Sequence, residues 1–61
     1  MKLTITITMD NAAFEPSNGE EIARILEKLA VLWRGESLEA GESAHLLDFN
    51  GNKVGKAEVT E

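Results

Sequence analysis

KLTITITM, residues 2–9 of this 61-residue chain, alternates polar and apolar side chains without a break. Successive side chains of a strand point to opposite faces, so the alternation predicts a half-buried β-strand. Five of its eight residues are β-branched, which favours a strand over a helix. The apolar face of this strand consists of Leu3, Ile5, Ile7 and Met9.

A loop and then a helix follow this strand. Residues 10–16 contain turn-forming residues and a proline that blocks a helix, so they predict a loop. The helix is predicted to begin near Gly19, because residues 17–20 and 18–21 both have the spacing of a capping box, and to end at Gly35. Its apolar face has helical spacing and consists of Ile22, Ile25, Leu26, Leu29, Leu32 and Trp33.

The last third of the chain predicts two strands joined by a hairpin. Residues 44–49 and a second run, from Lys53 or Val54 to Thr60, flank Asn50-Gly51, a pair that tolerates the positive φ of a tight turn. If Phe49 faces Val54 across that turn, neither face of the hairpin is uniformly apolar. Two or three apolar side chains then point away from the helix and form a partner surface.

Two further expectations concern the loops. The alternative to an outward-facing apolar surface is that the loop at residues 10–16 covers it through Phe14. Residues 35–43 predict a loop that returns the chain to the sheet and has room for one helical turn at Leu38.

These elements predict an α+β fold with the order β-α-β-β, in which one helix packs on a three-stranded, mainly antiparallel sheet. We expect the first strand to pair with the last, and a parallel pairing across the helical crossover is the alternative. Residues 1–61 form a single domain. A chain this short buries little apolar surface, so it needs either a very well packed core or further burial against a second molecule.

Composition excludes several kinds of chemistry. The chain has 11 acidic and 6 basic side chains, a net charge of −5, one histidine and no cysteine. The missing cysteines exclude a disulfide scaffold, a thiolate metal site and a thiol nucleophile. His45 and Ser43 share one face of a strand while Asp48 falls on the other, so these three cannot form a catalytic triad. We therefore predict a protein that is not an enzyme and has no cofactor.

A calcium site is also disfavoured. Asp48, Asn50 and Asn52 have the spacing of the first three ligands of a calcium-binding loop. The sixth and twelfth positions of that pattern require glycine and glutamate, but here they are Lys53 and Val59. We interpret the segment as a turn and predict no metal site.

The chain shows no membrane or export signal. Its longest apolar run, residues 29–33, is far shorter than the roughly 20 residues that a membrane-spanning helix needs. The first residues alternate in polarity and do not have the pattern of a signal peptide. We expect a cytoplasmic protein without a membrane partner.

The acidic side chains are concentrated in two connecting regions. Residues 10–21 and residues 36–48 each carry a charge of −4, while the rest of the chain carries +3. Spacing by three places carboxylates roughly 5 Å apart in a helix and about 10 Å apart in an extended chain, which brackets the phosphate repeat of a nucleic acid. The candidate partner-binding residues are Glu36, Glu39 and Glu42, supported by Asp10, Glu15 and Glu21.

This charge pattern predicts a phosphate mimic that binds a basic groove on a protein partner. Direct binding of nucleic acid is disfavoured, because the net charge has the wrong sign. The alternative is that the carboxylates only keep a very small protein soluble.

Three segments, DNAAFE at 10–15, EIARIL at 21–26 and DFNGNKVG at 48–55, resemble very short phage- and prophage-encoded proteins. The resemblance implies a small protein that acts on a host system inside the bacterial cell. A compact acidic protein of this kind is similar to the anti-CRISPR inhibitors that occupy DNA- or PAM-binding grooves of Cas complexes. The implied partner is a Cas effector subunit. The second hypothesis is a structural or regulatory phage module that acts through an apolar sheet face, as a monomer or a homodimer.

Overall fold

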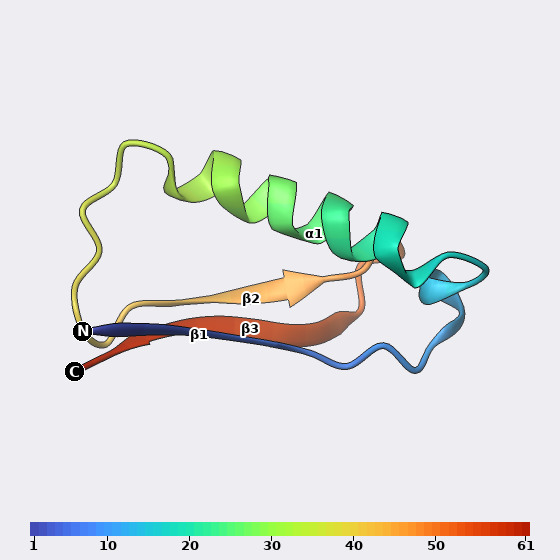
Figure 1. Cartoon of the computed structure of the whole chain (residues 1–61), viewed down its shortest axis with the longest axis horizontal. Helices are drawn as coiled ribbons and strands as arrows, with labels where there is room; N and C mark the ends of the chain where they lie inside the picture. The colour runs from blue at the N-terminus through green and yellow to red at the C-terminus, as the bar shows by residue number, and fades with distance from the viewer.

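The computed structural model describes all residues, 1–61. A single long helix lies along one face of a three-stranded sheet (Figure 1). The predicted β-α-β-β order and α+β class are therefore confirmed. In chain order the elements are β1 (Lys2–Ile7), the short 3₁₀ helix η1 (Ala12–Phe14), α1 (Asn18–Trp33), β2 (Ser43–Leu47) and β3 (Lys53–Thr60).

The sheet has the order β1-β3-β2, and both pairings are antiparallel. The first strand pairs with the last, as expected, and the alternative of a parallel crossover pairing is wrong. Leu3 lies opposite Val59 and Ile5 lies opposite Ala57. Directly opposed residues share a face, so the apolar side chains of β1 lie on the same face as the buried Ala57 and Val59.

The other face of the sheet is mostly polar. Thr4 and Thr6 of β1 lie opposite Glu58 and Lys56 of β3, and those two charged side chains form an ion pair at 2.8 Å. The predicted apolar outer face is therefore reduced to the exposed Leu47 and Phe49 near the hairpin. Leu3 and Ile5 of β1 are also exposed, but they lie on the face that is directed toward the helix.

The turn between β2 and β3 forms around Asn50-Gly51, as predicted, but its backbone conformation differs from the expected one. Gly51 has a φ of 87°, but no non-glycine residue has a positive φ, so Asn50 does not adopt the predicted conformation. The Gly51 N–H donates to the Asp48 carbonyl at 3.0 Å, and the Asp48 N–H donates to the Asn52 carbonyl at 2.9 Å. A three-residue loop closed by a glycine with positive φ is a common hairpin type.

This turn changes which residues are buried. The register shifts between Leu46 and Leu47, so that Leu46 pairs with Gly55 and Leu47 pairs with Lys53. Val54 is buried in the core under the helix, while Phe49 is 61% exposed in the turn. The predicted pairing of Phe49 with Val54 is therefore wrong, because a bulge moves Val54 to the opposite face.

The core is small and lies between the helix, η1 and the sheet. Ten of the 61 residues are buried, so little of the chain is shielded from water. Phe14 packs into this core beneath the helix, so the alternative in which it covers the outer sheet face is wrong. The core cluster consists of Ala13, Phe14, Ile25, Leu29, Leu46, Val54 and Ala57.

The helix ends differ in how well they were predicted. Ser17 is the N-cap residue but its side chain makes no capping hydrogen bond, so the predicted capping box at Ser17 is wrong. Gly35 follows the helix with a φ of 83°, as predicted for the residue that ends it. No helical turn forms around Leu38. The helix is too short and too polar to cross a bilayer.

Candidate functional site

The predicted acidic residues occupy separate places in the structure. Glu36, Glu39 and Glu42 lie in the connection between α1 and β2, while Asp10 and Glu15 flank η1. Figure 1 places these two connections at opposite ends of the molecule, whose longest extent is 35 Å. The prediction of one acidic surface is therefore corrected to two separate acidic ends.

The sixth predicted residue, Glu21, has an internal role. Its side chain is only 6% exposed, and its carboxylate accepts hydrogen bonds from Arg24 Nε at 2.9 Å and from the Phe49 N–H at 2.9 Å. Arg24 also donates to the Leu47 carbonyl at 2.9 Å. The Arg24 hydrogen bond lowers the pKa of Glu21 against the opposing effect of burial. Glu21 thus attaches the helix to the hairpin, and its assignment as a partner contact is corrected.

Asp48 also has a structural role, within the turn of the hairpin. Its carboxylate accepts backbone N–H groups of Asn50 at 2.9 Å and Asn52 at 2.8 Å, and the side-chain amide of Asn11 at 2.8 Å. Burial raises the pKa of Asp48, but these hydrogen bonds outweigh burial and the pKa is lowered. The calcium-like spacing of this segment therefore corresponds to a turn that is tied to the loop at residues 10–16.

The lowered pKa values predict that acid weakens the fold. A carboxyl group whose pKa is lower in the folded state stabilises that state above its unfolded pKa of about 4, and this contribution is lost as the pH falls through the folded value. We expect the urea concentration at the unfolding midpoint to decrease as the pH is lowered below about 4. Asp48→Asn should lower the midpoint at neutral pH and flatten this pH dependence.

The control for this experiment is Asp10→Asn, since Asp10 is exposed and makes no hydrogen bond through its side chain. The plot of its urea midpoint against pH should run parallel to that of the unmodified protein. If the plot for Asp48→Asn also ran parallel, Asp48 would not contribute to the pH dependence of stability.

The acidic connection between α1 and β2 is anchored at both ends. The Glu36 N–H donates to the Trp33 carbonyl at 3.0 Å, and the Val59 N–H donates to the Glu42 carbonyl at 2.9 Å. The Glu42 carboxylate also accepts the Glu39 N–H at 3.3 Å. These bonds hold the three carboxylates at one end of the molecule. We call Glu36, Glu39 and Glu42 the acidic loop.

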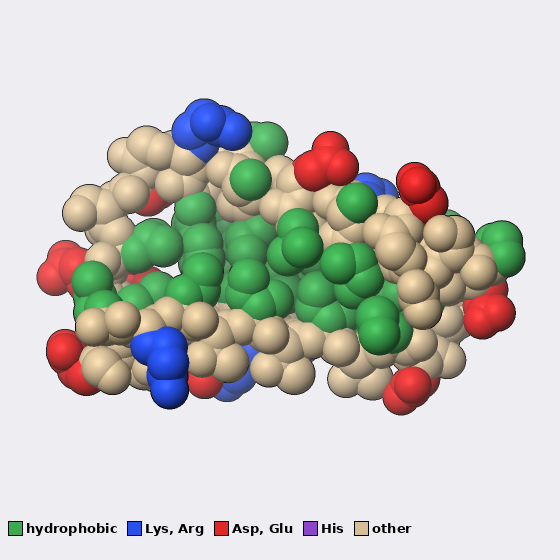
Figure 2. Space-filling model, viewed as in Figure 1, with side chains coloured by type: hydrophobic (Ala, Val, Ile, Leu, Met, Phe, Trp, Pro, Cys, Tyr) green, Lys and Arg blue, Asp and Glu red, His purple; other side chains and the backbone are tan.

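The acidic loop borders a hollow in the surface, visible at the left end of Figure 2. Neither Glu36 nor Glu42 takes part in an ion pair. Apolar side chains beside carboxylates that have no cation partner suit a lysine or arginine side chain, whose aliphatic stem packs on apolar groups while its charge reaches the acids. The hollow is lined by Leu32, Trp33, Glu36, Leu38, Glu42 and Ser43.

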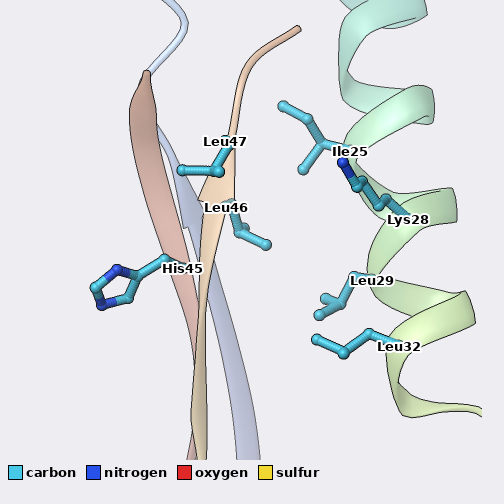
Figure 3. Close-up of a pocket in the computed structure, with 7 residues that line it drawn as sticks. All are labelled: Ile25, Lys28, Leu29, Leu32, His45, Leu46 and Leu47. Carbon is cyan, nitrogen blue, oxygen red and sulfur yellow. The ribbon is translucent and has the colours of Figure 1, made fainter. Parts of the chain in front are cut away.

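A second cavity lies between α1 and β2 and has a volume of about 170 Å³. Figure 3 shows Leu46 directed toward the helix while the ring of His45 points to the other side of the sheet. The cavity is smaller than the roughly 300 Å³ at which ligand sites begin. It is lined by Ile25, Lys28, Leu29, Leu32, His45, Leu46 and Leu47.

Comparison of the chain with known proteins found no matching family model, no curated relative and no matching solved structure. The function is therefore inferred from the geometry and charge of this chain. The resemblance to phage-encoded inhibitors stays a prediction.

Proposed function

We propose that this chain is a small, non-enzymatic inhibitor that binds a basic, nucleic-acid-binding surface of a host protein through its acidic loop. Mimicry of phosphate groups by carboxylates supplies the attraction. The bacterial cytoplasm is the proposed location, and a Cas effector subunit is the partner to test first. The observation that carries the proposal is a pair of carboxylates without a cation partner, Glu36 and Glu42, at a hollow whose lining also includes Leu32, Trp33 and Leu38.

The acidic loop supports this role better than the other acidic end of the molecule. The hollow near η1 is lined by Glu15, Glu20, Glu21 and Arg24 among others, so it includes its own cation. Arg24 is already bound to Glu21, at 2.9 Å. Glu15 and Glu20 have no cation partner there, but the charge of Arg24 in the same lining would repel an arriving basic side chain. At the acidic loop the carboxylates are exposed and their backbone is fixed, which lowers the entropy cost of binding.

The partner's chemistry follows from these contacts. Arginine and lysine side chains that normally hold phosphates would contact Glu36, Glu39 and Glu42. The overall charge of −5 would steer encounter with a positive surface, and salt would weaken the complex. Binding in this way blocks the groove to nucleic acid.

Reversing the charge of the acidic loop tests this proposal. We expect the triple variant Glu36→Lys, Glu39→Lys, Glu42→Lys to weaken partner binding by about a hundredfold or more, because attraction becomes repulsion. The measurement is competition with DNA for purified Cas effector complexes at low and high salt. A pull-down from host lysate, followed by the same competition, extends the test to other DNA-binding proteins.

The matched control changes the same amount of charge elsewhere. The triple variant Asp10→Lys, Glu15→Lys, Glu27→Lys alters exposed acids away from the acidic loop. It should retain most of the binding, apart from a loss of long-range steering. Equal loss in both variants would mean that net charge, and no particular surface, controls binding.

A second candidate function is a non-catalytic structural or regulatory module that acts through an apolar surface. The exposure of Leu3 and Ile5 on the helix-facing side of β1 favours it. Contacts of this kind are insensitive to salt or strengthened by it. Salt dependence therefore separates this candidate from the acidic inhibitor.

A further inference from the structure

The molecule exposes more surface than a folded chain of its mass normally does. Its accessible surface is 4378 Å², whereas a monomer of this size is expected to expose about 3,900 Å². Its radius of gyration is 12.1 Å, against about 10.5 Å expected for a compact chain of this length. Part of this surface is apolar and lies on β1, where Leu3 is 49% and Ile5 is 39% exposed.

This apolar surface lies on one side of the molecule. The helix packs on β2 and η1, which leaves the helix-facing side of β1 without a cover. Figure 2 shows apolar side chains gathered in a continuous band between the helix and β1. We call this surface the β1 band. It includes Leu3, Ile5 and Ile7 of the strand and the exposed Leu26 of the helix.

β1 is an edge strand, so the same residues also have backbone N–H and C=O groups that no neighbouring strand binds. The Thr8 N–H donates to the Val54 carbonyl at 2.8 Å, and an antiparallel ladder directs alternate residues to alternate sides. The even-numbered residues of β1 therefore bond to β3, while Leu3, Ile5 and Ile7 direct their N–H and C=O groups to the open edge. Val59, opposite Leu3, uses its own N–H and C=O on the β2 side.

The other edge of the sheet is protected. β2 is shorter and has a bulge between Leu46 and Leu47. The Leu47 carbonyl already accepts a hydrogen bond from Arg24 at 2.9 Å. Short edge strands, bulges and charged side chains at the edge are the usual means by which proteins prevent an edge strand from pairing with another chain. β1 has no proline and no bulge in its pairing, and its only charge is Lys2.

We propose that a second copy of this chain pairs with β1 across a two-fold axis at Ile5, forming an antiparallel homodimer. In this register Ile5 meets Ile5 of the second copy, and Leu3 meets its Ile7. Every free N–H group on the edge then faces a free C=O group. On the polar face Lys2 lies opposite Thr8 of the second copy, whereas a parallel pairing would bring two Lys2 side chains together.

The dimer contains a continuous six-stranded sheet with both helices on the same face. The two β1 bands adjoin, so that apolar side chains of both copies shield one another from water. The two acidic loops lie at opposite ends of the dimer, where each is free to bind a partner. This inference does not depend on the proposed inhibitor function.

Salt distinguishes this interface from partner binding. Each copy carries a net charge of −5, so electrostatic repulsion opposes dimer formation. Screening by salt is therefore expected to strengthen the dimer and to weaken binding through the acidic loop. The homodimer and the inhibitor function can therefore be tested separately, and failure of one does not exclude the other.

Sedimentation equilibrium tests the dimer from micromolar to millimolar concentration. The unmodified protein should approach twice its chain mass of 6.7 kDa as the concentration rises. Ile5→Lys should raise the dissociation constant about tenfold or more, because two like charges meet at the axis. Ile5→Glu should do the same. An equimolar mixture of the two variants should restore the dimer, since residue 5 of one chain then meets the opposite charge on the other.

The control is Thr4→Lys, which adds the same charge to the polar face of the same strand, opposite Glu58, and should leave the dimer nearly unchanged. Circular dichroism checks that each variant is folded. A monomeric unmodified protein at all concentrations would overturn the proposal, as would a mixture that stays monomeric while both of its components are folded.

Amide hydrogen exchange of the unmodified protein gives a test that needs no variant. The N–H groups of Leu3, Ile5 and Ile7 should be protected at high concentration and should exchange faster on dilution. Those of Thr4 and Thr6 bond to β3 and should be protected at both concentrations. Equal and rapid exchange of Leu3, Ile5 and Ile7 at every concentration would show that β1 stays unpaired.

Discussion

Gly55→Ala is expected to unfold most of the protein at room temperature. Gly55 lies in the central strand, opposite Ile7 of β1. A Cβ atom at this position would overlap the carbonyl oxygen of Thr6 and would lie 2.9 Å from the Cα atom of Ile7. These are backbone atoms, so no side-chain rotation can relieve the overlap, and β1 must move away from β3.

The size of this effect follows from how little stability a short chain has. Domains gain roughly 0.05–0.15 kcal/mol per residue, which for this length totals about 3–9 kcal/mol. Overpacking against backbone costs about 3 kcal/mol, and loss of β1 pairing adds to it. Urea unfolding followed by circular dichroism measures the change.

Gly19→Ala is the matched control. Gly19 lies in the first turn of the helix, and a Cβ atom there meets nothing within 4 Å. Alanine favours a helix over glycine by about 0.5–1 kcal/mol, so this variant should be as stable as the unmodified protein or more so. A Gly55→Ala protein with an unchanged urea midpoint would contradict the close approach of the two strands.

Phe14→Ala is expected to have the second largest effect. The Phe14 side chain is 3% exposed and belongs to the core cluster with Ile25 and Leu29 of the helix. Removing a buried phenylalanine ring costs about 3–5 kcal/mol, because the lost burial leaves a cavity that closes only partly. In a core of so few residues this loss is expected to consume much of the total stability.

The helix provides the control for Phe14→Ala. Val31 is 75% exposed on the outward side of the helix, so Val31→Ala removes almost no buried surface. Alanine also has the higher helix propensity. Thermal unfolding should therefore show a large fall in midpoint for Phe14→Ala and no fall for Val31→Ala. Similar midpoints would mean that the η1 segment is not part of the core.

The element types could be predicted from the sequence because their signals are local. The alternation from Lys2 predicted a strand, which forms over Lys2–Ile7, and the helical spacing predicted a helix, which forms over Asn18–Trp33. Gly35 ends the helix as predicted. Each of these features depends on neighbours within a few residues, which periodicity and backbone preference describe directly.

The hairpin register could not be predicted in the same way. The pair Asn50-Gly51 indicated a turn, but the number of loop residues depends on how Asp48 binds Asn11 and Asn52. Asn11 lies 37 residues away in the chain. The bulge next to this turn moves Val54 to the opposite face of the sheet, so a small error in the register reverses the predicted burial.

The candidate site was predicted in part. The spacing of Glu36, Glu39 and Glu42 drew attention to a loop that the structure places as one exposed end. The same reasoning included Glu21, whose carboxylate is bound by Arg24 and by the Phe49 N–H. Arg24 stands three residues from Glu21, so that ion pair was visible in the sequence, but the contact with the hairpin was not.

By itself, the sequence determined the order of elements, the faces of β1 and the helix, and the acidic character of the two connections. The tertiary structure alone decided that these connections lie at opposite ends, that Glu21 is internal and that the β1 band has no cover. The physical reason is that patterning specifies what each segment must bury. Which surfaces meet depends on a bulge and on where the helix rests across the sheet, and these follow from contacts between distant residues.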